Sequence, residues 1–184
     1  MSIDSIRAGD PASVLREAFD RAFAQAPSES AAVLERLLEI SVGSDRYVVR
    51  LAELSGFFTN SKITRLPSPV SELIGIGGIL GRVLPVYDLG MLLGYPRTAA
   101  PRGVAVTAHP QVGLACHGFA GYISAPQGSI VPAEIRATTG RRHVREVLQG
   151  ESPRLVIDLT SVLETIQQRI SSGSQTRGSG EERI

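Results

Sequence analysis

The chain has 184 residues, a length that fits one domain or two small ones. Nineteen Lys and Arg stand against eighteen Asp and Glu, and the resulting net charge of +1 argues against a surface built to hold nucleic-acid phosphates. Phe and Tyr together make up 5% and Trp is absent, which is too little aromatic content for a platform that stacks single-stranded nucleic acid. One cysteine, Cys116, excludes an internal disulfide.

No segment has the composition of a membrane span. The most apolar stretch, residues 73–84, is interrupted by glycines and Arg82, and the longest uncharged stretch, residues 103–133, contains His, Pro and Gln. A spanning helix needs about 20 mostly apolar residues in a row. The N-terminus carries Asp4, Arg7 and Asp10 without an apolar core behind them, unlike a signal peptide. We therefore expect a cytoplasmic protein with no direct membrane insertion.

The N-terminal extension, residues 1–35, contains a predicted amphipathic helix over residues 11–26. Asp10 suits the N-cap, Pro11 suits the first helical position, and Pro27 ends the pattern. The apolar residues recur at steps of three and four and form one face: Leu15, Ala18, Phe19, Ala22, Phe23 and Ala26. This helix either packs on its own domain, which we favour, or binds a partner. A second short helix could begin at Ser28 and run to Leu38.

From Leu38 onward the pattern is that of a β protein. Leu38, Ile40 and Val42 alternate with polar residues, the turn residues 43–46 follow, and β-favouring residues resume over 47–51, which predicts a hairpin. Further strands are expected over residues 63–66, 71–79, 82–87, 103–108, 112–116, 121–124 and 154–157. Many short strands separated by Gly and Pro favour a sandwich or small barrels. The folded region should span residues 36–170, with a disordered tail over 171–184.

The sequence contains a weak internal repeat with an offset of 70 residues. The segment 85–93, PVYDLGMLL, resembles the segment 155–163, LVIDLTSVL. In each copy a strand ends in Asp, at Asp88 and Asp158, and a short apolar helix follows. N-capping explains both aspartates without catalysis. Two similar halves would account for the repeat, and chance similarity remains the alternative.

The glycine-rich segment 75–81 does not fit a nucleotide-binding loop. Such a loop needs a helix N-terminus directly after the glycines, or Lys followed by Ser or Thr, whereas a strand-like sequence follows here. The segment instead predicts a tight hairpin in which glycines supply positive φ angles and close backbone approach. We expect no cofactor.

The remaining reactive side chains form no recognisable site. His109, His117 and His143 lack the spacing of metal ligands, and Cys116 and His117 are strand neighbours that point to opposite faces. A basic cluster, comprising Arg136, Arg141, Arg142, His143 and Arg145, is either a solvated loop or part of a surface for an acidic partner. We therefore expect a protein that is not an enzyme and binds no metal.

The order of these elements resembles the CheW-like chemotaxis coupling proteins. The residues that carry the resemblance are the hairpin 38–51, the segment ITRLP at 63–67, and a spacing of Gly75, Gly78, Gly81, Pro85 and Asp88-Leu89. The family's hallmark at this last place is Gly-x-x-Asn-x-Arg-Gly, three residues, then Pro-x-x-Asp-Leu. In the second half, VGLA at 112–115 followed by Gly118, the strand 155–157 and the closing helix fall in the family's order.

The resemblance implies an all-β fold of two SH3-like five-stranded β-barrels with pseudo-twofold symmetry and a closing C-terminal helix, to which the predicted N-terminal amphipathic helix is an addition. It also implies a non-catalytic adaptor in two-component chemosensory signalling, located at receptor arrays. Such an adaptor couples the cytoplasmic tip of a chemoreceptor, held in a groove between the barrels, to a CheA-type histidine kinase. An assembly or regulatory subunit of a motility or pili pathway, without direct receptor binding, is the alternative.

This chain departs from the family pattern at the hairpin tip. The family's Asn falls on Gly78 and its Arg on Leu80, which offers no guanidinium for pairing with a carboxylate. An exposed Leu at a turn suits apolar contact with a partner, and Arg82 would share its face if the strand were regular there. We expect the protein-binding residues to be Ile79, Leu80, Gly81, Arg82 and Val83.

Overall fold

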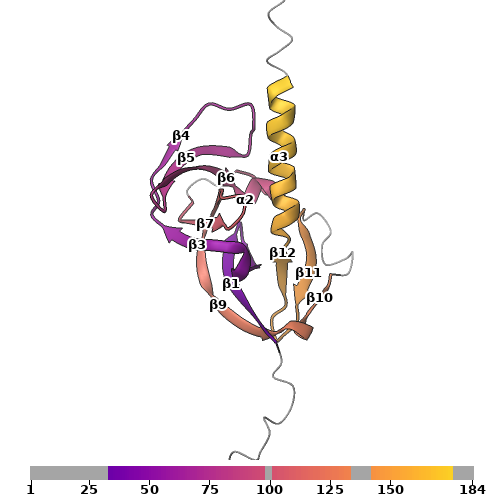
Figure 1. Cartoon of the computed structure of the whole chain (residues 1–184). Coiled ribbons are helices and arrows are strands. Elements are labelled where there is room, and N and C mark those ends of the chain that lie inside the picture. The colour runs from indigo at the N-terminus through magenta and orange to yellow at the C-terminus, as the bar shows by residue number, and fades with distance from the viewer. Residues whose placement is uncertain (1–32, 98–100, 134–141, 176–184) are drawn as a thin grey trace, which may run out of the picture. The chain divides into compact units, whose positions relative to one another are not determined.

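The computed structural model describes residues 33–97, 101–133 and 142–175 (Figure 1). The helix expected over residues 11–26 lies outside them, as do Arg136 and Arg141 of the basic cluster. The first half of the described chain contains β1 (Leu34–Val42), β2 (Asp45–Arg50), the 3-10 turn η1 (Leu51–Glu53), β3 (Leu54–Thr59), β4 (Ile63–Arg65), β5 (Leu73–Ile79), β6 (Arg82–Asp88) and the short helix α2 (Leu89–Leu92). The second half contains β7 (Gly103–Thr107), β8 (Gly113–Cys116), β9 (Gly118–Pro126), the 3-10 turn η2 (Gln127–Ser129), β10 (Ile130–Pro132), β11 (Val144–Leu148), β12 (Arg154–Ile157) and the helix α3 (Leu159–Gln175).

The strands form two six-stranded sheets that exchange their hairpins. One sheet has the order β10-β11-β12-β2-β1-β9 and the other β4-β5-β6-β8-β7-β3. Each strand of the first half therefore has a counterpart six places further along the chain, in the equivalent position of the other sheet. The β1–β2 hairpin joins the late strands, while the β7–β8 hairpin joins the early ones. This exchange ties the two halves of the chain to each other.

The 70-residue repeat corresponds to one structural unit in each sheet. β6 pairs in parallel with β8, and β12 pairs in parallel with β2, so each repeat strand lies beside the second strand of an exchanged hairpin. The carboxylate of Asp88 accepts a hydrogen bond from the amide of Met91 at 3.2 Å. That of Asp158 accepts one from the amide of Ser161 at 3.0 Å. Both aspartates are helix caps, as predicted, and such caps contribute about 1 kcal/mol each.

The main hydrophobic core collects side chains from both sheets and both helices. It contains Leu38 and Ile40 of β1, Leu114 of β8, Leu89 of α2 and Val162 of α3, all essentially inaccessible to solvent. β1 alternates between this core and a second cluster on its other face, where Leu37 packs. The alternation that predicted the hairpin reflects the side of β1 that faces the main core, while the polar residues Glu39 and Ser41 lie on the side of Leu37.

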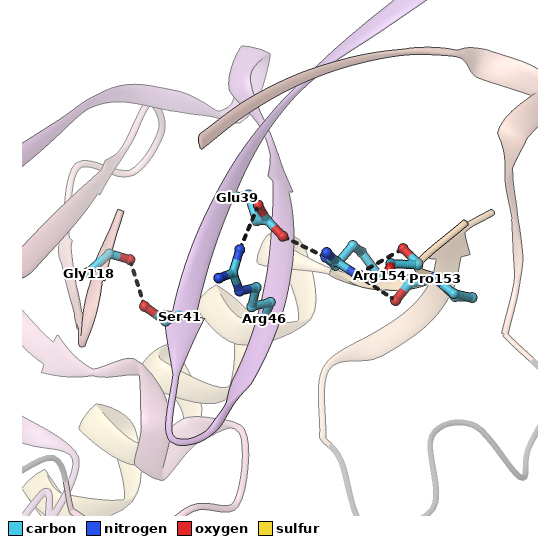
Figure 2. Close-up of polar contacts among 7 residues, drawn as sticks. Glu39, Ser41, Arg46, Gly118, Pro153 and Arg154 are labelled. Carbon is cyan, nitrogen blue, oxygen red and sulfur yellow. Dashed lines mark hydrogen bonds and ion pairs between the residues drawn. The ribbon is translucent and has the colours of Figure 1, made fainter. Parts of the chain in front are cut away.

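A buried carboxylate connects three strands of the first sheet (Figure 2). Glu39 of β1 is 7% exposed. The guanidinium of Arg154, on β12, lies 2.5 Å from one carboxylate oxygen, and that of Arg46, on β2, lies 3.6 Å from the other. Because an unpaired charge is strongly unfavourable when buried, the two arginines offset the cost of placing a carboxylate at this position.

Several sequence-based expectations are corrected by the structure. Residues 34–38 belong to β1, so the helix expected up to Leu38 is absent there, because Leu34 begins the pairing with β9. β3, β10 and β11 were not predicted, and β11 contains part of the supposed basic loop, with Arg145 paired to Asp158 at 3.2 Å. α3 continues through Gln175, beyond the expected start of the tail at residue 171.

The sheets have six strands each. Their closure into SH3-like barrels stays a prediction. The glycine-rich segment 75–81 forms a hairpin as predicted, and a Cβ at Gly75 would lie only 2.0 Å from the carbonyl oxygen of Thr64. Within the described residues, no helix is both long and apolar enough to cross a membrane.

Candidate protein-binding surfaces

The first candidate surface is the hairpin tip, defined as residues 79–83. Ile79 pairs with Arg82, so the connection between β5 and β6 is a two-residue turn made by Leu80 and Gly81. Both have positive φ, 55° at Leu80 and 69° at Gly81, which is the pattern of a type I′ turn. That turn favours Asn or Gly at its first position, and a left-handed conformation costs an ordinary L-residue about 1 kcal/mol. Leu80 is therefore an unfavourable choice for folding.

The hairpin tip presents apolar side chains to solvent. Leu80 is 49% exposed and Val83 is 70% exposed. Gly78, which pairs with Val83, has no atom within 4 Å of where a Cβ would lie, so the surface beside Val83 is open. Ile79, in contrast, is 4% exposed and packs in a core cluster with Leu84 and Val86. Of the five predicted residues, Ile79 thus anchors the turn in the core and exposes almost no surface that a partner could contact.

Arg82 does not share a face with Leu80 in the way that a regular strand would give. The turn begins at Leu80, so the alternation of strand faces ends at Ile79. The Arg82 guanidinium instead donates to the side-chain carbonyl of Gln111 at 2.9 Å. Gln111 lies in the β7–β8 connection, and Arg82 thereby links the hairpin tip to the neighbouring hairpin of the same sheet.

The second candidate surface, which sequence reasoning missed, is the aromatic face formed by Phe57, Phe119 and Tyr122. Phe119 and Tyr122 lie three residues apart on β9, which would place them on opposite sides of a regular strand. A bulge changes the register, so that Phe119 pairs with Ile40 and Tyr122 pairs with Leu38. Directly paired residues share a face of the sheet. The bulge therefore gathers both rings over the core-facing side of β1.

The aromatic face is only partly covered. Phe119 is 45% exposed and Tyr122 is 68% exposed, with their ring centroids 5.0 Å apart. Phe57, from β3 of the other sheet, lies 5.9 Å from Phe119, so the edge strands of the two sheets meet here (Figure 1). The bulge was not foreseeable, but aromatic side chains in a strand with small neighbours, as in GFAGY, were an available signal.

A shallow cavity of about 410 Å³ lies at the start of β1. Leu34, Glu35, Arg36, Leu51 and Ala52 line it. Leu34 is 59% exposed. It shares one side of β1 with Arg36 and Leu38, and Leu38 pairs with Tyr122. Leu34 and Arg36 of the cavity thus lie on the same side of β1 as the partner position of Tyr122, and two of the five lining residues, Glu35 and Arg36, are charged.

The reactive side chains considered in the sequence are held within the fold by burial or by hydrogen bonds. Cys116 is buried, and burial raises the pKa of its thiol to about 12, so it stays protonated. His117 accepts a hydrogen bond through Nδ1 from the amide of Gly43 at 3.0 Å. Burial lowers the pKa of His143, whose Nδ1 lies 2.8 Å from the hydroxyl of Ser161. Among the described residues, no group of His, Cys, Asp and Glu has the arrangement of a metal site.

Two hairpin-exchanged sheets that carry exposed apolar side chains define an all-β module with surfaces suited to protein contact. The family model described as "CheW-like domain" matches residues 36–167, and the chain belongs to this family, as the sequence motifs indicated. The scaffolding protein TtCheW from Thermoanaerobacter tengcongensis has a similar structure, with a TM-score of 0.59 and 17% identity over 67% of this chain and 88% of that one. At this identity the likeness concerns the fold. No curated protein sequence gives a significant match.

Proposed function

We propose that this protein is a non-catalytic adaptor in chemosensory signalling that couples a chemoreceptor to a CheA-type histidine kinase. Its membership of the CheW-like domain family supports the proposal. The observation that carries it further is the pair of uncovered apolar surfaces, one at the hairpin tip and one where the edge strands of the two sheets meet. An adaptor needs two such surfaces, because it must hold two partners at the same time.

The hairpin tip is the proposed kinase contact. Leu80 and Val83 offer apolar area, and the open space over Gly78 admits a side chain of the partner. Residues at the centre of protein interfaces are typically apolar, whereas exposed apolar side chains at a turn gain nothing from water. Arg82 contributes a charge at the edge of this surface.

The aromatic face is the proposed receptor contact. Chemoreceptor tips are helical hairpins, and an amphipathic helix binds through its apolar side to an apolar groove. Phe119 and Tyr122 are rigid, exposed rings of the kind that provide most of the binding energy at such sites.

The test uses the purified full chain and its cognate kinase. Leu80→Asp and Arg82→Glu are each expected to weaken kinase binding by more than tenfold, about 1.4 kcal/mol, with the melting temperature nearly unchanged. Gln167→Asp, at an exposed position on α3, is the matched control and should bind normally. Normal binding by both hairpin-tip variants, or unfolding of Leu80→Asp, would contradict the assignment of this surface.

One observation favours a second function, a regulatory or assembly subunit without direct receptor binding. Leu80 stands where the resemblance places an Arg, so this chain lacks the ionic contact expected of a standard coupling protein. Affinity capture from the native cell separates the two functions. Recovery of both a histidine kinase and a receptor supports the coupling adaptor, and recovery of neither supports the alternative.

A further inference from the structure

Arg82 and Arg154 occupy matching places in the two sheets and have different kinds of partner. Arg82 is the first residue of β6 and Arg154 is the first residue of β12, so each begins the second strand of a hairpin. Arg154 lies 2.5 Å from a carboxylate oxygen of Glu39, and its side chain is 25% exposed. Arg82 is exposed, and its guanidinium donates to the side-chain oxygen of Gln111 at 2.9 Å. A neutral amide orients a guanidinium without neutralising its charge.

The partner of Arg82 also differs in charge from those of other arginines in the molecule. Among the residues that the structure describes, five other arginines lie beside a carboxylate: Arg46, Arg50, Arg145, Arg154 and Arg169. Arg82 forms no ion pair within this described part of the chain. It therefore keeps an uncompensated positive charge at the hairpin tip, in the same surface as the apolar side chains of Leu80 and Val83.

The β7–β8 connection fixes the position of Gln111. Thr107, which is 1% exposed, donates its hydroxyl to the carbonyl of Pro110 and accepts a hydrogen bond from the amide of Val112 at 3.1 Å. These two residues flank Gln111, which is itself half-buried. Gln111 thus presents its oxygen from a constrained backbone, and the hydrogen bond restrains the long side chain of Arg82 before a partner arrives. Such preorganisation lowers the entropic cost of binding.

We propose that the partner of the hairpin tip places a carboxylate against Arg82, beside its apolar contacts with Leu80 and Val83, and that Gln111 positions the guanidinium to receive it. This inference rests on the proposed function, in which the kinase takes this surface. A carboxylate matches the fork of N–H donors on Arg82, whereas a wholly apolar segment would cover the cation without pairing it. The surface therefore selects an apolar segment that carries an Asp or Glu.

Gln111→Glu in the full-length protein is the most direct test. The new carboxylate still accepts from Arg82 and so preserves the hairpin, but it neutralises the guanidinium and competes with the carboxylate of the partner. Affinity for the purified cognate kinase should fall at least about fivefold, with the melting temperature unchanged or higher. Gln167→Glu, the same substitution at an exposed position on α3, is the matched control and should bind normally. A hydrogen bond with a purely structural role predicts normal binding by Gln111→Glu as well.

A double-mutant cycle with Arg82→Gln and Gln111→Ala shows whether Gln111 acts through Arg82. Arg82→Gln should reduce kinase affinity about tenfold and remove most of its dependence on salt concentration, because an ion pair at the edge of an interface is screened by salt. Gln111→Ala alone should reduce the affinity about threefold, since the guanidinium is then no longer held. Added to Arg82→Gln, it should cause no further loss.

The outcomes separate this inference from the proposed function. Normal kinase binding by Gln111→Glu, or an unchanged salt dependence in Arg82→Gln, overturns the inference and leaves the kinase contact in place. Losses that add fully in the double variant contradict the positioning role of Gln111. The same variants are also measured against a purified cytoplasmic receptor fragment. Losses seen only with the receptor support the inference and contradict the assignment of the hairpin tip to the kinase, and a wild-type chain that binds neither protein contradicts both.

Discussion

Two hairpins of this molecule have two-residue turns, and the two turns differ in how closely the rest of the chain packs against them. The β1–β2 turn, Gly43-Ser44, is held by other parts of the chain: the ring of Tyr95 lies against Gly43, and His117 accepts from the Gly43 amide. The β5–β6 turn, Leu80-Gly81, has no atom within 4 Å of a Cβ built on Gly81, and it projects an exposed Leu. The difference separates a turn that the fold requires from one that it tolerates.

The residue types at the two turns agree with this distinction. Gly43 has φ +62° and, lacking a Cβ, meets no steric penalty there. Leu80 has φ +55° in the same left-handed region, where a branched side chain is unfavourable. Folding explains Gly43 fully but does not explain Leu80. The proposed contact of the hairpin tip with another molecule would explain an exposed residue that costs stability at a projecting turn.

Gly43→Ala is expected to have the largest effect. The added Cβ would lie 2.7 Å from the ring of Tyr95, and alanine is strained at this φ, so the free energy of unfolding should fall by about 2–3 kcal/mol. Urea denaturation measures this change. Gly128→Ala, at a site with nothing within 4 Å of the new Cβ, is the control and should change stability by less than about 0.5 kcal/mol. An equal loss in both variants would mean that Tyr95 does not constrain the turn.

Tyr95→Phe should have the next largest effect. The Tyr95 hydroxyl donates to the carboxylate of Asp45, and it lies 2.7 Å from the hydroxyl of Tyr47. Burial and these contacts raise the Tyr95 pKa, so the hydroxyl remains a donor throughout the neutral range. Its removal should cost about 1–2 kcal/mol in thermal denaturation. Tyr122→Phe removes a hydroxyl from an exposed ring and should leave the melting temperature unchanged.

The two turns also show which features of the fold could be predicted from the sequence alone. Local chemistry predicted both hairpins, since turn residues and alternation are properties of neighbouring residues. Three structural features depend instead on distant pairing: the parallel pairing of β12 with β2, the exchange of hairpins between the sheets, and the bulge that gathers Phe119 and Tyr122. β11 was missed because Arg145 and its basic neighbours suggested a solvated loop, whereas Val144 and Leu148 are buried.

His117→Ala tests the second contact that holds the β1–β2 turn. Loss of the bond from the Gly43 amide to the imidazole should lower stability by about 1 kcal/mol, less than Tyr95→Phe because the site is exposed. Native-state hydrogen exchange of the Gly43 amide is the direct measurement. Exchange should accelerate in His117→Ala, and an unchanged rate would show that the bond does not protect this turn.

Leu80→Asn is the smallest and most decisive change, because stability and binding are expected to move in opposite directions. Asn-Gly is the preferred sequence for a turn with two positive φ angles, so this variant should be more stable by about 0.5–1 kcal/mol. At the same time it removes the exposed apolar side chain at the centre of the hairpin tip, and kinase affinity should fall by about tenfold. Gly81→Ala, which strains the same turn without removing Leu80, should lower stability by about 1 kcal/mol. Melting temperature and kinase affinity measured on the same samples therefore test whether Leu80 is retained for binding. If Leu80→Asn loses stability as well, the side chain contributes to the fold, and the distinction between the two turns fails.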